Sequence, residues 1–391
     1  MPLECSAIII PDMDPASLDD THRLLRDSVR RFVVNEVRPR AARWEDEGAV
    51  PRAVLRAMGG LGFLGLRVPA QHGGAGLDAR ATAVFAEELG RSGFGGVAIT
   101  VLVHTDMASP HLVNAGSPEQ LARYLPGIVS GERISAVAVT EPGAGSDVKA
   151  IRTRARRDGA YWVLDGTKMF ITNGVHADLV FVAAKTEPAA GAKGISMFIV
   201  EKGMAGFSVG RALDKMGWRS SDTAELVFDA CRVPDANRLG DKGRGFYSIM
   251  RNFQNERIAI GAMALGECAR ALELTLDYAR TRSAFGAPLW DKQGIRQRLA
   301  MLAARIEAGR ALVYHAAWLD AQGLDCVKEV SMVKAYCGEL VNEVMYDCLQ
   351  FHGGAGYMRD SAIERMYRDA RVQSIGGGAT EVMLEEVAKR L

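Results

Sequence analysis

Five short segments combine glycine with polar or aromatic residues in a way that suits contact with a small molecule. They are VTEPGAGSD at 139–147, KMFITNG at 168–174, RSAFG at 282–286, QFHGGAGY at 350–357 and SIGGGATE at 374–381. Neighbouring glycines let backbone N–H groups approach a phosphate closely, and an arginine supplies a planar fork of donors. Each segment alone is equally compatible with a turn or a helix end, so the residues by themselves leave the role of these segments open.

Motifs of several common enzyme classes are absent or out of context. A GxGxxG pattern occurs at Gly60, Gly62 and Gly65, but helical sequence precedes it where a dinucleotide-binding site needs a strand. The chain has no HExxH and no GxSxG sequence, which disfavours a zinc hydrolase and a serine hydrolase. His104 and His111 lie seven residues apart, so we expect surface or capping positions rather than ligands. We expect no metal site.

The composition excludes further partners. The 48 Lys and Arg residues nearly balance 47 Asp and Glu residues, for a net charge of +1, which gives no electrostatic case for binding nucleic acid or an anionic membrane. In RTRARR, the residues Arg152, Arg154 and Arg156 alternate and should form one solvated strand face. No uncharged run approaches the ~18 apolar residues of a membrane span, so we expect no membrane insertion.

The cellular location is expected to be cytoplasmic. Six scattered cysteines without a CxxC pair suit a reducing compartment. The first residues, MPLECSAIIIPDMD, have acidic side chains before the first arginine, Arg23, which is not typical of a secretory or transit signal.

The periodicity of apolar residues changes twice along the chain. Leu25, Val29, Phe32, Val33 and Val37 recur at helical spacing, and SPEQ at Ser117 predicts a capped helix start. From Ile134 to about Pro234 the period is two, with Asp-Gly turn signals at Asp158 and Asp165, which predicts an antiparallel β domain. Helical spacing returns after this region, with long helices near 244–283, 290–322 and 327–350 and shorter ones after Asp360 and Thr380.

These changes predict an α+β fold with three domains, in keeping with a length of 391 residues. The predicted domains are an N-terminal α-helical domain at 1–133, a central antiparallel β domain at 134–240 and a C-terminal α-helical bundle domain at 241–391.

The five segments, in this order, together with VPAQHGGAG at 68–76, resemble the acyl-CoA dehydrogenase family over nearly the whole chain. The resemblance implies the same three domains, with a C-terminal four-helix bundle. It also implies an FAD cofactor, a homotetramer and electron transfer to an electron-transferring flavoprotein.

The resemblance assigns cofactor-binding positions in the predicted β domain and in the C-terminal domain. It implies that Val137, Val139, Thr140, Phe170 and Thr172 lie around the isoalloxazine ring. Three positions match residues that reach the FAD of a neighbouring subunit: Arg282, Phe285 and Gln293. A loop with Gln350, Gly353 and Gly354 is implied to lie against the same cofactor. Ala379 and Glu381 follow the last loop at further cofactor-binding positions. Ala379 departs from the family pattern, because the hydroxyl often found near the FAD is shifted to Thr380 or lost.

The resemblance implies a less common position for the general base. Many family members place this glutamate after a tyrosine in the C-terminal loop, where this chain has Gly376 and Gly377. Isovaleryl-CoA and long-chain members carry it on a bundle helix directly before an arginine, and NFQNERIAIG places Glu256 before Arg257 in the same way. The resemblance therefore implies that Glu256 is the catalytic base, although a solvated helix glutamate is the plainer interpretation of an isolated Glu.

The remaining site residues concern the substrate. The resemblance implies that the N–H of Gly377 donates to the thioester oxygen, an oxyanion-hole effect of ~3 kcal/mol per donor. Ser146, Arg257 and Tyr278 match positions that contact acyl-CoA, although Ser146 is also compatible with a plain turn. Loss of two large side chains at 376 and 377 predicts tolerance of branched or bulky acyl groups.

The leading hypothesis is therefore an FAD-dependent acyl-CoA dehydrogenase of fatty acid β-oxidation that forms a trans-2-enoyl-CoA. The alternatives are an acyl-CoA oxidase-type relative that uses oxygen and a non-catalytic FAD-binding assembly subunit.

Overall fold

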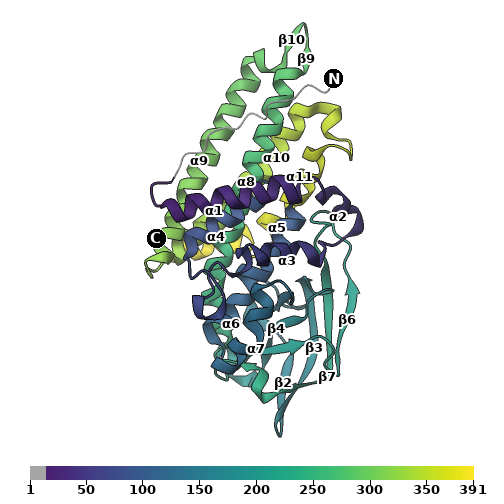
Figure 1. Cartoon of the computed structure of the whole chain (residues 1–391), viewed down its shortest axis with the longest axis vertical. Helices are drawn as coiled ribbons and strands as arrows, with labels where there is room; N and C mark the ends of the chain where they lie inside the picture. Colours follow the sequence, from purple (N-terminus) through teal and green to yellow (C-terminus); the bar gives the residue numbers. More distant parts are fainter. Residues whose placement is uncertain (1–14) are drawn as a thin grey trace. The chain divides into compact units, whose positions relative to one another are not determined.

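The computed structural model describes residues 15–391. The chain runs from helices through strands to helices (Figure 1), which confirms the predicted α+β class. The expectations for the first fourteen residues, including Cys5, lie outside the described residues.

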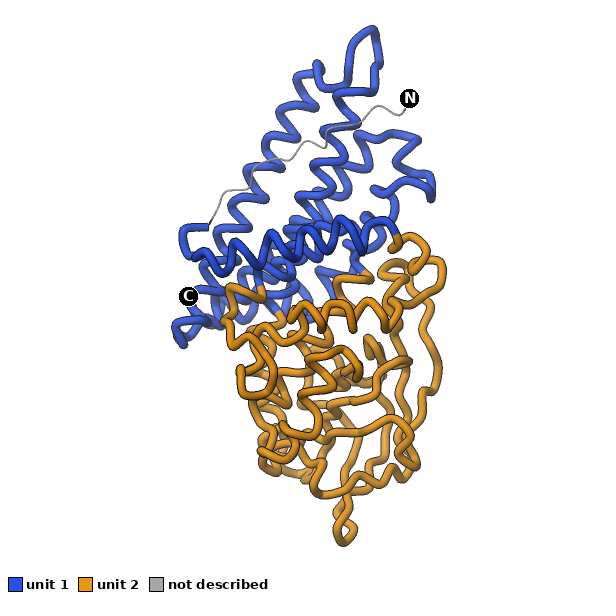
Figure 2. Tube along the Cα trace, viewed as in Figure 1, with its two compact units in different colours: residues 1–39, 83–95, 257–391 blue, residues 40–82, 96–256 orange. Residues whose placement is uncertain are grey.

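The chain separates into two compact units that cut across this order (Figure 2). Unit 1 comprises Met1–Pro39, Ala83–Gly95 and Arg257–Leu391, and unit 2 comprises Arg40–Thr82 and Gly96–Glu256. The boundaries at 134 and 241 follow changes of secondary structure, which is a different criterion, so they stay a prediction.

Helices begin and end close to the expected positions. The first half of the chain contains α1 (Asp20–Phe32), α2 (Ala41–Glu47), α3 (Arg52–Gly60), α4 (Ala79–Gly90), α5 (Gly95–Leu102), α6 (Ser109–Ala115) and α7 (Pro118–Val129). The second half contains α8 (Gly245–Thr281), α9 (Gln293–Ala321), α10 (Val327–Gly356), α11 (Ala362–Ala370) and α12 (Thr380–Ala388). The predicted capping box is present, because Ser117 Oγ accepts from Gln120 N while Gln120 Oε1 accepts from Ser117 N.

Unit 2 is built on a mostly antiparallel sheet. Its strands are β1 (Ser135–Ala138), β2 (Arg154–Asp158), β3 (Tyr161–Thr172), β4 (Leu179–Lys185), β5 (Ile195–Glu201), β6 (Phe207–Ala212), β7 (Thr223–Pro234) and β8 (Arg238–Leu239). The order is β6-β7-β3-β2-β4-β5-β8, and only β1 and β2 pair with β4 in parallel. The remaining strands, β9 (Ser283–Ala284) and β10 (Ala287–Pro288), form a separate hairpin.

Strand β4 is buried on both faces for a simple reason. Leu179, Phe181 and Ala183 pack in one apolar cluster with Leu125 and Ile128 of α7, while the alternate residues of β4 pack in another with side chains of β3 and β7. The period of two therefore divides the strand between a helix layer and the rest of the sheet. The alternating arginines of RTRARR are exposed, as predicted.

One predicted turn is absent. Asp158 and Gly159 do connect β2 to β3, but Asp165 and Gly166 lie inside β3. The pairing register of β3 and β7 shifts between Leu164 and Gly166, and a Cβ on Gly166 would lie 2.7 Å from the Thr153 Cα. The glycine therefore serves a β-bulge at a close backbone approach rather than a turn.

In unit 1, helices α8, α9 and α10 pack through small residues. A Cβ on Gly261 of α8 would meet Val333 of α10 at 2.3 Å, and Gly309 of α9 faces Leu265 at 2.8 Å. These contacts leave no room for larger side chains, so the helix backbones approach closely. No helix within residues 15–391 is long and apolar enough to cross a membrane.

Candidate functional site

In unit 2, the segment that follows β1 is tied to β3. Lys168 is fully buried, and its Nζ donates to the Val139 carbonyl at 2.9 Å and to Glu141 Oε1 at 2.8 Å. The N–H of Met169 donates to the Thr140 carbonyl at 2.9 Å. Burial lowers the pKa of Lys168 to about 8, while Glu141 opposes this change. Three consecutive residues, 139–141, are thus held by two residues of β3.

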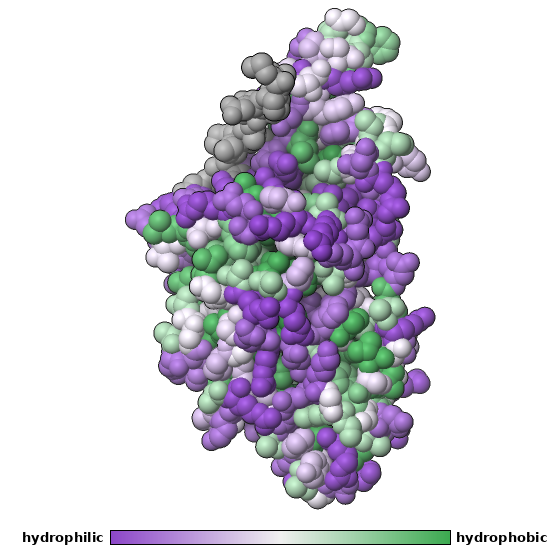
Figure 3. All heavy atoms as spheres, turned by 45° about the vertical axis from the view of Figure 1, so that its right-hand side comes forward, coloured by the Kyte–Doolittle hydropathy of each residue, from purple (hydrophilic) through white to green (hydrophobic). Residues whose placement is uncertain are grey.

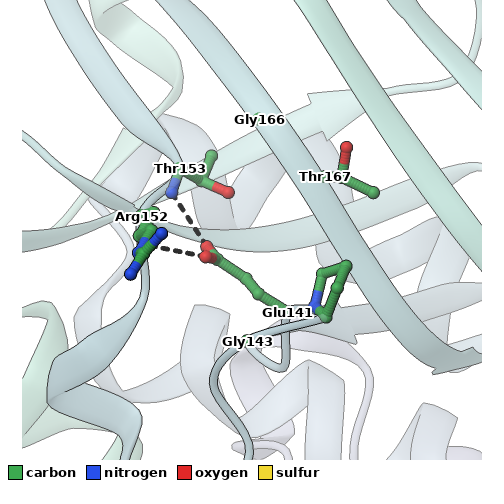
Figure 4. A pocket seen from close by; sticks show the side chains of 7 residues that line it. Glu141, Gly143, Arg152, Thr153, Gly166 and Thr167 are labelled. Atoms are coloured by element: carbon green, nitrogen blue, oxygen red, sulfur yellow. Dashed lines mark hydrogen bonds between the residues drawn. The ribbon is translucent and has the colours of Figure 1, made fainter.

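The Glu141 carboxylate completes this connection. It accepts from the backbone N–H groups of Arg152, at 2.5 Å, and Thr153, at 2.9 Å, and Figure 4 shows it turned toward both. A hollow of about 270 Å³ lies beside it, lined by Glu141, Pro142, Gly143, Arg152, Thr153, Gly166 and Thr167. The predicted substrate residue Ser146 is exposed on the same loop.

The β3 segment also presents an aromatic side chain outward. Phe170 has a φ of 62°, and the register of β3 and β7 shifts between Lys168 and Ile171. This bulge leaves Phe170 67% exposed. Val137 of β1, Val139 and Thr140 directly after β1, and Thr172 of β3 are half-buried, and the N–H of Met169 joins this region to the Thr140 carbonyl. An open aromatic side chain next to apolar residues and a hydroxyl suits a flat, partly polar ring such as a flavin.

Glu256 lies about three turns into helix α8 and is only 7% exposed. The Nδ2 group of Asn252, one turn earlier, donates to Glu256 Oε1 at 2.9 Å and to the Met107 carbonyl at 2.9 Å. Asn255 Nδ2 donates to the Asp106 carbonyl at 2.9 Å. The carboxylate is therefore buried and oriented, not solvated on a helix surface.

The C-terminal loop with Gly377 belongs to unit 1 and is held by Lys334. This lysine of α10 is buried, and its Nζ donates to the carbonyls of Gln373, at 2.5 Å, and Gly378, at 2.9 Å. Gly377 has a φ of +67°, and a Cβ there would lie 2.4 Å from Ile260 Cδ1. A side chain at 377 would be strained and would displace Ile260, whereas the nearest atoms to a Cβ on Gly376 are 3.7 Å away.

Two predicted cofactor residues follow this loop directly. Ala379 precedes α12 as its N-cap residue without a side-chain cap, and Glu381 is exposed in the first turn. The shifted hydroxyl, Thr380 Oγ1, donates to Glu339 Oε1 at 2.7 Å, so this hydroxyl is engaged within the protein.

The other predicted cofactor residues of unit 1 lie elsewhere on the helices. Phe285 is 99% exposed with a φ of 53°, in the turn between β9 and β10. This hairpin belongs to an arm formed by residues 282–293, which is labelled β9 and β10 in Figure 1 and corresponds to the uppermost atoms of Figure 3. Arg282 and Gln293 are exposed at its two ends, and Gln350, Gly353 and Gly354 are exposed near the end of α10. The Tyr278 hydroxyl donates to the His352 carbonyl at 3.2 Å, and its ring stacks on the His352 ring at 4.4 Å.

The structure therefore brings the predicted residues of unit 1 together in two groups. Lys334, which holds the Gly377 loop, and Gln350 are 16 residues apart on α10, or about 24 Å along the helix axis. Tyr278 lies with the second group, whereas Arg257 donates from Nη1 to Ser331 Oγ at 3.4 Å, near the Lys334 end of α10.

Several important residues were not found from the sequence. Lys168 lies inside a segment singled out there, but its partners, Val139 and Glu141, are almost thirty positions earlier in the chain. Asn252 had a usable signal, since a residue four positions before Glu256 faces the same side of a helix. Lys334 had none, because its partners are backbone carbonyls about forty positions later.

The histidine expectation was wrong about exposure. His104 and His111 are both buried; His104 Nδ1 accepts from the Ser135 N–H at 3.1 Å, and His104 Nε2 lies 3.0 Å from the Ile128 carbonyl. Burial lowers the pKa of each to about 4. Within residues 15–391, no group of three His, Cys, Asp or Glu side chains is arranged to hold a metal ion.

Comparison with known proteins identifies the family. Residues 19–132, 136–231 and 243–391 match the N-terminal, middle and C-terminal domains of acyl-CoA dehydrogenase. The chain belongs to the acyl-CoA dehydrogenase family. It is an oxidoreductase acting on acyl-CoA, and its cofactor is FAD.

Two curated members and one solved structure illustrate the similarity. The mouse long-chain specific acyl-CoA dehydrogenase of mitochondria is 42% identical over 95% of this chain and 86% of its own length. The acyl-CoA dehydrogenase of Bacillus subtilis is 41% identical over 94% of this chain and 97% of its own. The crystal structure of the acyl-CoA dehydrogenase from Geobacillus kaustophilus has a TM-score of 0.92 and 38% identity, covering 96% of this chain and 99% of its own.

Proposed function

We propose that this acyl-CoA dehydrogenase desaturates an acyl-CoA thioester between its α and β carbons to give a trans-2-enoyl-CoA. Glu256 removes the proton from the α carbon as the general base. Bound FAD supplies the acceptor for the hydride that leaves the β carbon. The observation that carries the proposal is the burial of Glu256 with a hydrogen bond from Asn252, because both features suit a base and neither is expected of a surface glutamate.

The Gly376–Gly377 segment supports this assignment. Neither residue carries a carboxylate, and a side chain at 377 would collide with Ile260. The N–H of Gly377 remains available for the thioester oxygen, where it would stabilise the charge that develops as the proton leaves. The second catalytic role is therefore assigned to this backbone group.

The acyl pocket is proposed to accept branched or bulky chains through Gly376. A Cβ at 376 would make only ordinary contacts, at 3.7 Å from Val372, whereas a Cβ at 377 would lie 2.4 Å from Ile260 Cδ1. The gain in room is thus expected on one side of the loop only. If straight short chains exceed every branched or long thioester in kcat/KM, this part of the proposal is wrong.

The roles of the binding residues are proposed as follows. The isoalloxazine ring would lie against Phe170, Thr172, Val137, Val139 and Thr140, because β3 exposes an aromatic side chain beside the segment held by Lys168. Ser146 and Arg257 are assigned to acyl-CoA. Tyr278 is also assigned to acyl-CoA, although its hydroxyl is engaged by the His352 carbonyl.

A homotetramer is proposed from the family, and the two groups of predicted cofactor residues in unit 1 support sites shared between subunits. Gly377, Ala379 and Glu381 lie near Lys334, about 24 Å along α10 from the group of Gln350. Arg282, Phe285 and Gln293, together with Gln350, Gly353 and Gly354, are therefore assigned to the FAD of a neighbouring subunit. The full exposure of Phe285 supports a role against another chain.

Electron-transferring flavoprotein is the proposed electron acceptor, and fatty acid β-oxidation in the cytoplasm the proposed setting. The five cysteines within the described residues are free and buried, as suits a reducing compartment. An oxidase-type relative and a non-catalytic subunit remain the alternatives.

The test is anaerobic titration of the FAD-loaded protein with straight, branched and long acyl-CoA thioesters, followed by the visible flavin spectrum. Bleaching by one thioester, with an enoyl-CoA as product, is expected. Oxygen consumption during aerobic turnover would indicate an oxidase instead. A yellow protein that no thioester bleaches would support the non-catalytic alternative.

A further inference from the structure

A buried glutamate of α8, Glu267, contacts the segment that leads into the loop with Gly377. Glu267 is 2% exposed, and Gln373, in the short helical turn Arg371–Ser374, is fully buried. Gln373 Nε2 donates to Glu267 Oε2 at 2.5 Å. The backbone carbonyl of Gln373 accepts from Lys334 Nζ. Glu267 and Lys334 therefore hold the same residue, one by its side chain and the other by its backbone.

Two oxygens of this arrangement have no hydrogen-bond donor. Glu267 Oε1 and Gln373 Oε1 are buried, and within residues 15–391 neither atom has a partner. If Glu267 were ionised, both oxygens would stay buried without a hydrogen-bond donor. Each unsatisfied buried acceptor lowers the stability of the folded state. A proton on Glu267 Oε1 would convert one acceptor into a donor and satisfy the other.

The surrounding charges also oppose ionisation. Burial, and then the carboxylate of Asp369 on α11, raise the pKa of Glu267 well above its usual range. The nearby cations are engaged elsewhere: Arg310 of α9 donates to Glu87 of α4, and Lys334 of α10 donates to two backbone carbonyls. Cys268 and Cys337 are buried thiols whose pKa values are raised by burial, so they add no charge near neutral pH.

We propose that Glu267 is held as a neutral carboxylic acid that pairs with the Gln373 amide through two hydrogen bonds and so positions the Gly377 loop. The acid O–H donates to Gln373 Oε1, and Gln373 Nε2–H donates to Glu267 Oε2. Glu267 is thus a positioning residue, and this part rests on the role proposed above for the Gly377 N–H.

The pH dependence of stability follows from this state. Glutamate in the unfolded chain ionises near pH 4.3, roughly, whereas folded Glu267 keeps its proton to a much higher pH. Between these two pKa values the unfolded state binds fewer protons than the folded state. Each increase of one pH unit therefore lowers the ratio of folded to unfolded protein by about tenfold through this group. Glu267→Gln removes this penalty and keeps both hydrogen bonds.

The first experiment compares the melting temperature of holoenzyme variants from pH 5 to pH 9. Glu267→Gln should melt at or above the wild type, with a gain that increases as the pH rises. Glu87→Gln is the matched control, because Glu87 of the same unit accepts from Arg310 Nε and the Tyr314 hydroxyl, each at 2.9 Å, and should be destabilised at every pH. A Glu267→Gln protein that loses stability as Glu87→Gln does would overturn the proposal. So would a difference from wild type that does not change with pH.

The second experiment tests positioning by rapid flavin reduction. Glu267→Gln should reduce its flavin within about twofold of wild type, whereas Glu267→Leu should be about tenfold slower, with acyl-CoA affinity changed less than the rate. Rescue by Gln separates a positioning role from simple filling of the site. Equal rates for Leu and wild type would overturn the positioning role. The melting curves do not depend on catalysis, so they would stand even if the proposed reaction were wrong.

Discussion

At Glu256, the identity of the residue and its setting come from different parts of the chain. The sequence places Glu256 on a helix before Arg257, and the structure adds burial and the hydrogen bond from Asn252. Asn252 also donates to the Met107 carbonyl, which fixes its own orientation. The proposed base is therefore oriented by a residue of its own helix that is anchored to another segment of unit 2.

Removing this orientation should slow the reaction without removing the base. Asn252→Ala deletes one hydrogen bond to a charged group, worth about 1.5 kcal/mol or somewhat more, so flavin reduction should fall by about tenfold. The measurement is stopped-flow flavin reduction at saturating acyl-CoA. Asn342→Ala is a suitable control, because Asn342 Nδ2 likewise donates to a backbone carbonyl, that of Gly338. A control variant that slows as much as Asn252→Ala would argue against a specific effect on Glu256.

The limits of sequence-based prediction are clearest at buried polar residues. His104 looked like a surface residue because its partners, Ser135 and Ile128, are 24 to 31 positions away. The burial of Lys168 and Lys334 was equally hard to predict. Each lysine donates to backbone carbonyls that lie far away in the sequence and that only the fold brings near. Glu256 was singled out by family resemblance and not by periodicity, and its role as the base stays a prediction.

At the scale of elements, strand β3 shows why spacing alone misplaced a turn. Its two bulges let one strand pass Thr153 closely at Gly166 and present Phe170 outward. Asp165 and Gly166 have the composition of a hairpin turn, but the paired strands continue through them. The helix boundaries of the C-terminal half were predicted more accurately, because long 3.6-residue periodicity is a stronger signal than short alternation.

The hydrogen bonds of Lys168 and Met169 to residues 139–141, here called the β3 clamp, should support FAD binding. Lys168→Met leaves the buried Glu141 carboxylate without its cation, which typically costs about 3–5 kcal/mol. We expect a lower melting temperature and faster loss of FAD, measured by the rise of free flavin fluorescence. The Lys168→Met/Glu141→Gln double variant removes the unpaired charge and should recover part of the stability. A single variant that holds FAD as tightly as wild type would show that the clamp is dispensable.

At the scale of the whole molecule, the order of helices, strands and helices was predictable from periodicity, whereas the compact units were not. Unit 1 gathers three separate stretches of chain, and a change of period cannot reveal that 83–95 belongs with 257–391. The separation of the two groups of predicted cofactor residues along α10 likewise appears only once the helix is built.

If the arm serves a neighbouring subunit, two inactive variants should complement each other. Arg282→Ala removes the arm's guanidinium, and Glu256→Gln removes the base. Co-expressed subunits should form sites with an intact base from one chain and an intact arm from the other, and recover up to about a quarter of wild-type activity per subunit. Each variant expressed alone is the control. Co-expression that yields no more activity than the two separate proteins would place the arm in its own subunit's site.

The central claim is that Glu256 is the base, and Glu256→Gln tests it most directly. The measurement is anaerobic stopped-flow reduction of the FAD-loaded variant by the acyl-CoA thioester that reduces the wild-type flavin fastest. FAD content and acyl-CoA affinity are measured in parallel. We predict that cofactor and substrate binding remain near wild type, while flavin reduction slows by a factor of about 10³ or more. Reduction at a near-normal rate would contradict the account and place the base elsewhere.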